Sequence, residues 1–145
     1  MEKEQWKPIE EFNGQYEVSN FGRVRSMKKY RGLTCRIMPQ TKQHHGYHAV
    51  MLWMNNKAYC RKVHRLVAQA FIENNKGLLE VNHKDGNHDN NAVSNLEWIT
   101  HKANVQHSYD IGIKQPHRWT DEERKQISER NKILCRRQPK NPAMF

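Results

Sequence analysis

Acidic residues are missing from a long part of this sequence. Between Val18 and Ile72 there is no aspartate or glutamate, while eleven lysines and arginines lie in the same stretch. The whole chain of 145 residues carries a formal net charge of +10. A surface that only confers solubility normally mixes charges of both signs, so this distribution indicates a polyanionic partner, of which DNA and RNA are the usual examples.

Cysteines are few and far apart. Cys35, Cys60 and Cys135 form no CxxC pair, so neither a zinc knuckle nor a disulfide framework is indicated. An odd number of cysteines in a basic chain fits a reducing compartment, and the charged start MEKEQWKPIEEF lacks the apolar segment of a secretory signal. We therefore expect a cytoplasmic protein.

Long apolar runs are also missing. Mean hydropathy is −1.07, and no segment approaches the length needed to cross a membrane, so no membrane partner is expected. The apolar residues come in short pieces, which predicts two small cores surrounded by loops. Strand and helix patterns both occur among them, which predicts an α+β protein of two main parts and a C-terminal extension.

The first half of the chain has the pattern of two β-hairpins. YEVS and RVRS alternate in residue type around the turn NFG, and this hairpin places Arg23 and Arg25 on one face of its second strand. Residues 28–46 are rich in basic residues and chain breakers, which predicts an irregular connection. YHAVMLWMNNKAYCRKV then predicts a second hairpin with Asn55 and Asn56 in its turn.

The second half begins with a change of period. Apolar residues at i, i+3, i+4, i+7 and i+8 from Val63 predict an amphipathic helix of about ten residues. LLEVNH and NLEWIT are expected to form short strands, with a loop between them and a helix after Thr100, its expected N-cap. Thr120 and Glu123 form a capping box that starts a last, mostly charged helix.

The segment between Glu80 and His107 holds four histidines and six asparagines in 28 residues. Hydrolysis of a phosphodiester needs a base for water and a cation to balance charge on phosphorus. A neutral histidine suits the first task, and amide oxygens suit magnesium or can orient an imidazole through a hydrogen bond. The strand–loop–strand–helix unit would bring such groups together.

This segment resembles the HNH endonucleases of the intron and phage homing type. VNHKDGN, NNAVSNLEWIT and AN carry the resemblance, the helix VHRLVAQAFI precedes them, and YEVSNFGRVRS is similar to the DNA-binding module that often accompanies this nuclease. Together these motifs span about residues 6–107. The resemblance implies a ββα-metal core, also called a His-Me finger, after an N-terminal β-hairpin DNA-binding module. The tail RWTDEERKQISERNK is weakly similar to a helical DNA contact element.

The resemblance assigns roles to individual residues. His83 would be the general base, Asn95 would brace it, and Asn82 and Asn104 would bind one divalent cation, Mg²⁺ or Mn²⁺. Asn82 stands where the family usually has aspartate, so weak metal affinity without DNA is expected. His88 would assist the leaving group, and His107 lies one helical turn after Asn104.

Other polar and aromatic residues have plainer expectations. Asp85 and Asp89 are expected to form turns rather than to bind metal. Trp98 is expected to pack toward the helix that starts at Val63, and Trp6, Tyr16 and Phe21 to form a local core. The expected DNA contacts are the basic residues Arg23, Arg25, Lys28, Lys29, Arg31, Arg61, Lys62 and Arg65.

The sequence thus predicts a DNA endonuclease that hydrolyses phosphodiester bonds in double-stranded DNA and is site-specific or nicking. We expect a monomer rather than a dimer, encoded by a phage or a bacterial host. The predicted parts are a DNA-binding module at 1–62, a nuclease core at 63–110, a linker at 111–119, and a C-terminal helix and tail at 120–145. Two other interpretations stay open: a DNA-binding regulator whose nuclease centre has degenerated at Asn82, and an RNA-binding protein.

Overall fold

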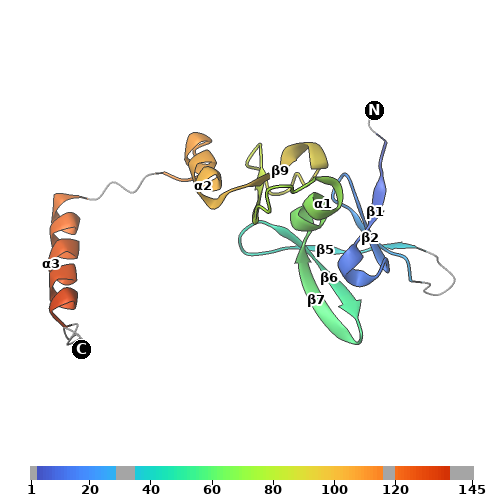
Figure 1. Ribbon diagram of the computed structural model, residues 1–145, viewed down its shortest axis with the longest axis horizontal. Coiled ribbons are helices and arrows are strands. Elements are labelled where there is room, and N and C mark those ends of the chain that lie inside the picture. The colour runs from blue at the N-terminus through green and yellow to red at the C-terminus, as the bar shows by residue number, and fades with distance from the viewer. Residues whose placement is uncertain (1–2, 29–34, 116–119, 138–145) are drawn as a thin grey trace, which may run out of the picture. The chain divides into compact units, whose positions relative to one another are not determined.

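The computed structural model describes residues 3–28, 35–115 and 120–137, with the side chains of the last helix described as far as residue 131. Within these ranges the chain has three antiparallel sheets (Figure 1). Strands β1 (Trp6–Pro8), β2 (Tyr16–Ser19), β3 (Val24–Ser26) and β4 (Arg36–Ile37) form the first, with the short 3₁₀ helix η1 (Glu10–Phe12) after β1. The second contains β5 (Gln40–Lys42), β6 (His48–Met54) and β7 (Lys57–Lys62).

The third sheet is a hairpin that follows the amphipathic helix. Helix α1 (Val63–Phe71) leads to β8 (Glu80–His83), the 3₁₀ helix η2 (Val93–Asn95), β9 (Leu96–Ile99) and helix α2 (His101–Asp110). The hydroxyl of Thr100 accepts a hydrogen bond from the Ala103 backbone N–H, which confirms the predicted N-cap. The α+β class and the predicted ββα unit are therefore confirmed.

Residues 28–46 are more regular than expected. Strands β4 and β5 both fall in this segment, so the prediction of an irregular connection is wrong for 36–37 and 40–42, while Lys29 and Arg31 lie outside the described residues. The sequence pattern also did not predict strand β1. All three are short strands at sheet edges, and such strands are held by backbone pairing and need no alternating pattern.

The turn of the second hairpin explains its pair of asparagines. Asn55 and Asn56 have φ values of 51° and 60°, the left-handed region that a two-residue type I′ turn requires at both positions. Asparagine tolerates this region better than most residues, so the sequence pattern and the backbone agree.

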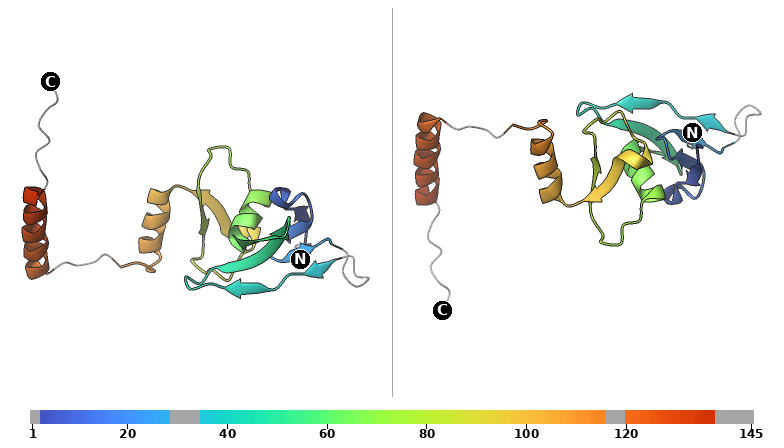
Figure 2. Two further views of the ribbon diagram at one scale, coloured as in Figure 1. Left: turned by 90° about the horizontal axis from the view of Figure 1, so that it is seen from below. Right: turned by 90° about the horizontal axis from the view of Figure 1, so that it is seen from above.

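The described residues share one apolar core rather than the two that the sequence suggested. Phe12 and Tyr16 from the first sheet, Leu52 from the second, Val67 from α1 and Leu96 from β9 belong to one cluster of buried side chains. Figure 2 shows α1 between the N-terminal strands and the β8–β9 hairpin, and α1 contacts strands of all three sheets. This core contains residues from both sides of position 62. The boundary predicted there therefore separates two predicted functions, DNA binding and cleavage, and not two separate cores.

The aromatic residues of the first sheet are arranged differently from the prediction. Tyr16 is buried, but Phe21 is 42% exposed and Trp6 is only partly buried. Phe12 takes the central place and contacts the rings of Tyr16 and Tyr59 edge to face. The prediction was wrong for Phe21, because it occupies the β2–β3 turn, where a side chain points away from the sheet. Trp98 packs as expected and donates a hydrogen bond to the carbonyl of Ile72, just after α1.

The last helix forms a separate unit. Residues 1–113 make one compact unit and residues 114–145 another, and α3 spans Asp121–Arg137. The backbone N–H of Glu123 donates to the Thr120 hydroxyl and the N–H of Thr120 donates to the Glu123 carboxylate, as a capping box requires. Among the described residues, no helix is both long and apolar enough to span a membrane.

Candidate active site

The asparagine-rich loop between β8 and β9 is organised around one carboxylate. Asp85 accepts hydrogen bonds from the Asn87 backbone N–H and from the side chains of Asn90 and Asn95, each at 2.8 Å. The hydrogen bond from Asn90 contributes most to lowering the pKa of Asp85. Uncharged amides can both donate and accept hydrogen bonds, so several of them satisfy one another and the backbone in a loop without strand pairing. Asp85 therefore forms the expected turn and holds the loop closed.

His83, the predicted base, lies at the end of β8 and is only 3% exposed. Its ring lies among three others, with ring centroids 5.1 Å from His64, 5.3 Å from His88 and 6.0 Å from Tyr47. Burial lowers the pKa of His83 below its ordinary value. An imidazole of this kind is neutral at cellular pH and can accept a proton.

The side chain that holds His83 is one that sequence reasoning missed. Asn95 was expected to brace the imidazole, but it donates to Asp85 and to the Asn90 carbonyl. The Oδ1 atom of Asn91 lies 3.0 Å from Nε2 of His83 instead. The loop folds back so that residue 91 stands opposite the ring, and a run of asparagines in the sequence carries no sign of which one does so.

The two predicted metal ligands each lie beside a carboxylate. The Asn82 amide donates to Glu97 at 2.9 Å, and the Asn104 amide donates to Glu80 at 2.7 Å. Hydrogen bonds from Asn104 and His101 hold the pKa of Glu80 below its usual value. These two glutamates are a second set of residues that the sequence analysis did not single out.

The donor set fits a hard divalent cation. Carboxamide and carboxylate oxygens are the ligands that Mg²⁺ and Mn²⁺ prefer, and Glu80 and Glu97 place negative charge beside the neutral Asn82 and Asn104. The described residues contain no cluster of three or more histidine, cysteine, aspartate or glutamate side chains suited to a metal.

The predicted base His83 and the predicted ligand Asn82 lie on opposite faces of β8. Glu80 and Asn82 are two positions apart on β8 and so share one face, to which Asn104 of α2 is hydrogen-bonded. His83 follows Asn82 directly and contacts the ring of His64 from α1. The structure thus brings Asn82 and Asn104 to one side and His83 to the other, and their convergence on one phosphate stays a prediction.

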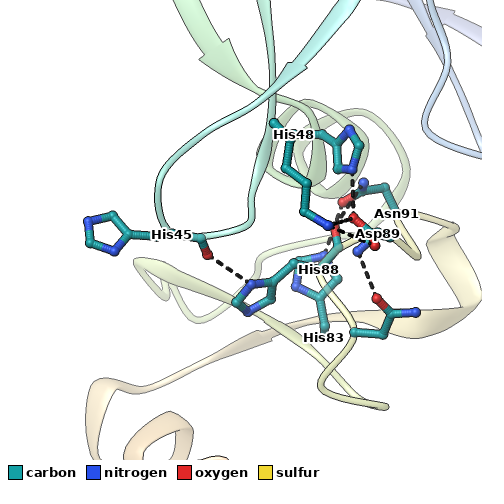
Figure 3. A network of polar contacts seen from close by, with 8 residues as sticks. His45, His48, His83, His88, Asp89 and Asn91 are labelled. Atoms are coloured by element: carbon teal, nitrogen blue, oxygen red, sulfur yellow. Dashed lines mark hydrogen bonds and ion pairs between the residues drawn. The ribbon is translucent and has the colours of Figure 1, made fainter.

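The segment before β6 closes over the histidines. Tyr47 stacks on His88 with ring centroids 4.0 Å apart, and Nδ1 of His88 lies 3.1 Å from the His45 carbonyl oxygen (Figure 3). The Asp89 carboxylate is hydrogen-bonded to His48 at 2.8 Å and forms an ion pair with Lys42, instead of closing the turn expected of it. The second sheet therefore contributes directly to the surroundings of His83.

The His107 ring is hydrogen-bonded to the asparagine-rich loop rather than to Asn82 or Asn104. Its Nε2 lies 3.1 Å from the carbonyl oxygen of Lys84, at the start of the asparagine-rich loop. We therefore assign His107 to the contact between α2 and the loop.

The expected DNA contacts divide into paired and unpaired cations. Three arginines bind carboxylates from the segment before Val18: Arg23 with Glu4, Arg25 with Glu17, and Arg61 with Glu11. Three other cations contact no carboxylate among the described residues: Lys28 donates to the Trp53 carbonyl, Lys62 lies 4.7 Å from the Tyr47 ring centre, and Arg65 donates to the Leu79 carbonyl. The acid-free stretch of sequence is thus partly neutralised in three dimensions.

The buried imidazole of His64 predicts acid sensitivity. Burial lowers its pKa to about 3, from an ordinary value of 6.5, so the unfolded chain binds this proton more strongly than the folded chain. Stability is therefore greatest above the ordinary value and falls as the pH drops below it. From neutral pH to about pH 5 we expect His64 to lower the free energy of unfolding by roughly 2 kcal/mol.

Urea unfolding of the wild type and of His64→Leu at both pH values measures this effect. The leucine variant should lose less stability on acidification, because it cannot take up the proton when it unfolds. Equal losses in the two proteins would show that His64 is not the group responsible.

Two known family models together match most residues of the compact unit 1–113. A family model described as the NUMOD4 motif matches residues 4–53, and one described as HNH endonuclease matches residues 61–106. The solved structure of DNA binding and cleavage by the HNH homing endonuclease I-HmuI matches with a TM-score of 0.68 and 35% identity, covering 88% of this chain and 68% of that one. The chain belongs to the HNH endonuclease family.

Two curated relatives of this HNH endonuclease chain come from viruses. It is 42% identical over 108 residues to DNA endonuclease I-HmuI of Bacillus phage SP01, a match that covers 74% of this chain and 59% of that enzyme. It is 41% identical over 110 residues to the uncharacterized HNH endonuclease L245 of Acanthamoeba polyphaga mimivirus, covering 76% of this chain and 31% of that protein. The HNH endonuclease chain described here thus spans about three-fifths or less of the curated relatives it matches.

Proposed function

We propose that this chain is a DNA endonuclease that hydrolyses phosphodiester bonds in double-stranded DNA, of the homing type, with His83 as general base. The observation that carries the proposal is a buried, neutral imidazole hydrogen-bonded by an amide at the end of β8, in a chain of the HNH endonuclease family. A monomer has one such centre, which favours a nick in one strand. We place its action in the cytoplasm of a bacterium, with the gene carried by that host or by a phage.

In the proposed reaction, His83 activates a water molecule that attacks the phosphate. His83 accepts a proton from water, the resulting hydroxide forms a bond to phosphorus, and the bond from phosphorus to the 3′ oxygen breaks. The departing 3′ oxygen takes up a proton from solvent water, so the products carry a 5′-phosphate and a 3′-hydroxyl. His88, whose ring lies beside that of His83, would assist the departing oxygen.

A divalent cation completes this centre. Oxygens of Asn82 and Asn104 would hold it, and when bound it supplies positive charge that stabilises the charge developing on the phosphate. Glu80 and Glu97 orient these two amides through the hydrogen bonds described above. Neutral ligands bind a cation weakly, so DNA phosphate is expected to contribute to the affinity for metal.

Incubation with supercoiled plasmid tests the proposal. Conversion to open circles with Mg²⁺ or Mn²⁺, and none with EDTA, is the expected result. An intact plasmid under all metal conditions, together with tight duplex binding, would instead support the regulator with a degenerate centre. Competition between duplex DNA and RNA in the same buffer tests the nucleic acid preference.

The substitution Asn82→Asp tests the cation site. A charged ligand should tighten Mn²⁺ binding by about 10-fold, because ligand charge sets the affinity of oxygen sites. The new carboxylate would also stand against Glu97 in place of their hydrogen bond, so the variant should be less stable than wild type without metal and regain stability when metal is added. Calorimetric titration and thermal unfolding with and without Mn²⁺ measure the two effects.

The substitution Asn75→Asp is the matched control, because Asn75 is an exposed asparagine beside Glu73 and precedes the strand β8 that carries Asn82. It should change neither metal affinity nor the metal dependence of stability. Unchanged Mn²⁺ binding in Asn82→Asp would remove Asn82 from the coordination of the cation.

A further inference from the structure

Asn91 is fixed so that only its oxygen can face the catalytic histidine. The side chain is 6% exposed, its amide nitrogen donates to the His88 carbonyl at 3.3 Å, and its oxygen lies 3.0 Å from Nε2 of His83. The hydrogen bond to the His88 carbonyl identifies the amide nitrogen of Asn91, since a carbonyl oxygen can only accept. The oxygen of Asn91 therefore has the imidazole as its partner.

This arrangement determines the position of a hydrogen on His83. A carbonyl oxygen cannot donate, so Nε2 of His83 must carry the hydrogen, and in a neutral ring the lone pair is then on Nδ1. Among the hydrogen bonds of the described residues, Nδ1 of His83 has none, so it is available to a water molecule. We propose that Asn91 is a positioning residue that holds His83 in the tautomer with the hydrogen on Nε2 and the basic lone pair on Nδ1. This inference rests on the proposed role of His83 as the base.

The β2–β3 turn holds Asn91 in this position. Gly22 has a φ of +83°, and a Cβ built on it would lie 2.7 Å from the Cβ of Asn91 and 3.2 Å from its carbonyl oxygen. Two hydrogen bonds secure the contact: the Val93 backbone N–H donates to the Asn20 carbonyl at 2.8 Å, and the side chain of Gln40 donates to the Gly22 carbonyl at 2.7 Å. The turn SNFG therefore does more than join two strands, because it presses the N-terminal sheet against the residue that orients His83.

The tautomer can be measured directly in the wild-type chain. Nitrogen-15 labelled histidine and correlation spectra through two bonds distinguish a protonated ring nitrogen from an unprotonated one, and His83→Ala assigns the signals. At a pH where the ring is neutral, we expect Nε2 protonated and Nδ1 unprotonated. The opposite pattern in the folded wild type would overturn the inference without any variant.

Two substitutions separate positioning from packing. Asn91→Leu keeps a side chain of similar size and removes the acceptor, whereas Asn91→Asp keeps an acceptor toward Nε2. Measured at alkaline pH, where either ring is neutral, we expect Asn91→Leu to lose about 100-fold in kcat with KM changed less than about 3-fold, as for other residues that orient a functional side chain. Asn91→Asp should recover most of this loss, and Asn91→Leu should show a mixture of tautomers. Asn75→Leu, the same change at an exposed position, should match the wild type.

The outcomes distinguish this inference from the proposed function. If His83→Ala is inactive while folded Asn91→Leu retains the wild-type kcat and tautomer, only the role of Asn91 is refuted. If His83→Ala cuts as well as wild type, the base itself is misassigned and both proposals fall. If Asn91→Asp is no more active than Asn91→Leu, the side chain serves packing and the positioning role is overturned.

Discussion

Replacing His83 with alanine is expected to reduce the rate of strand cutting about 10³-fold in Mg²⁺, the loss typical of a missing general base. The reason is specific to this imidazole. Burial lowers its pKa, so the ring is neutral at cellular pH, and the Asn91 amide holds it in one orientation. Among the described histidines, only His83 is both buried and hydrogen-bonded to a side-chain amide.

The measurement compares cutting with binding. Nicking of supercoiled plasmid gives the rate, and fluorescence anisotropy on a labelled duplex gives the affinity, which should stay within about 2-fold of wild type because His83 carries no charge to attract phosphate. His44→Ala is a suitable control, since His44 is an exposed histidine of the loop before β6. Equal loss of binding and cutting in His83→Ala would mean that the ring has a structural role.

Affinity for duplex DNA is expected to fall steeply with salt. A protein that neutralises six or more phosphates loses about 10³-fold in affinity between roughly 50 and 200 mM salt, because condensed counterions are released on binding. Lys28, Lys62 and Arg65 contact no carboxylate among the described residues, whereas Arg23, Arg25 and Arg61 hold ion pairs with glutamates. The pairs of Arg23 and Arg61 lie at the surface and contribute little to stability, so phosphate can compete for these two arginines.

Anisotropy titrations over a range of salt concentrations test this expectation. Lys62→Ala should reduce the slope of log affinity against log salt by about 1, while Lys76→Ala, an exposed lysine beyond the acid-free stretch, should leave it unchanged. Glu11→Gln should tighten binding, because Arg61 then has no ion pair to give up. A flat salt response in the wild type would exclude the basic stretch as the DNA-binding face.

Local patterns in the sequence were enough for most of the helices and strands. The period that begins at Val63 predicts α1, and the threonines at 100 and 120 predict the starts of α2 and α3. Each of these signals acts between residues a few positions apart, so it survives in the sequence alone. Strands β4 and β5 could not be found in this way, because an edge strand is defined by the partner that it pairs with.

The candidate site was predictable in kind but not in its contacts. The strand, loop, strand and helix that carry His83, Asn82 and Asn104 follow from the order of the motifs, and the family assignment confirms that unit. The partner of His83 proved to be Asn91, the amides of Asn82 and Asn104 proved to bind Glu97 and Glu80, and three arginines of the acid-free stretch proved to be paired.

The sequence by itself determined which elements form and which chemical groups are present, since helix period, strand alternation and capping depend on near neighbours along the chain. Only the tertiary structure decided which groups meet. Arg61 and Glu11 are 50 positions apart, and the turn at Gly22 reaches a loop about 70 residues further along the chain. Contacts of this range depend on how the sheets pack around α1, and burial in that packing is what sets the pKa of His83 and His64.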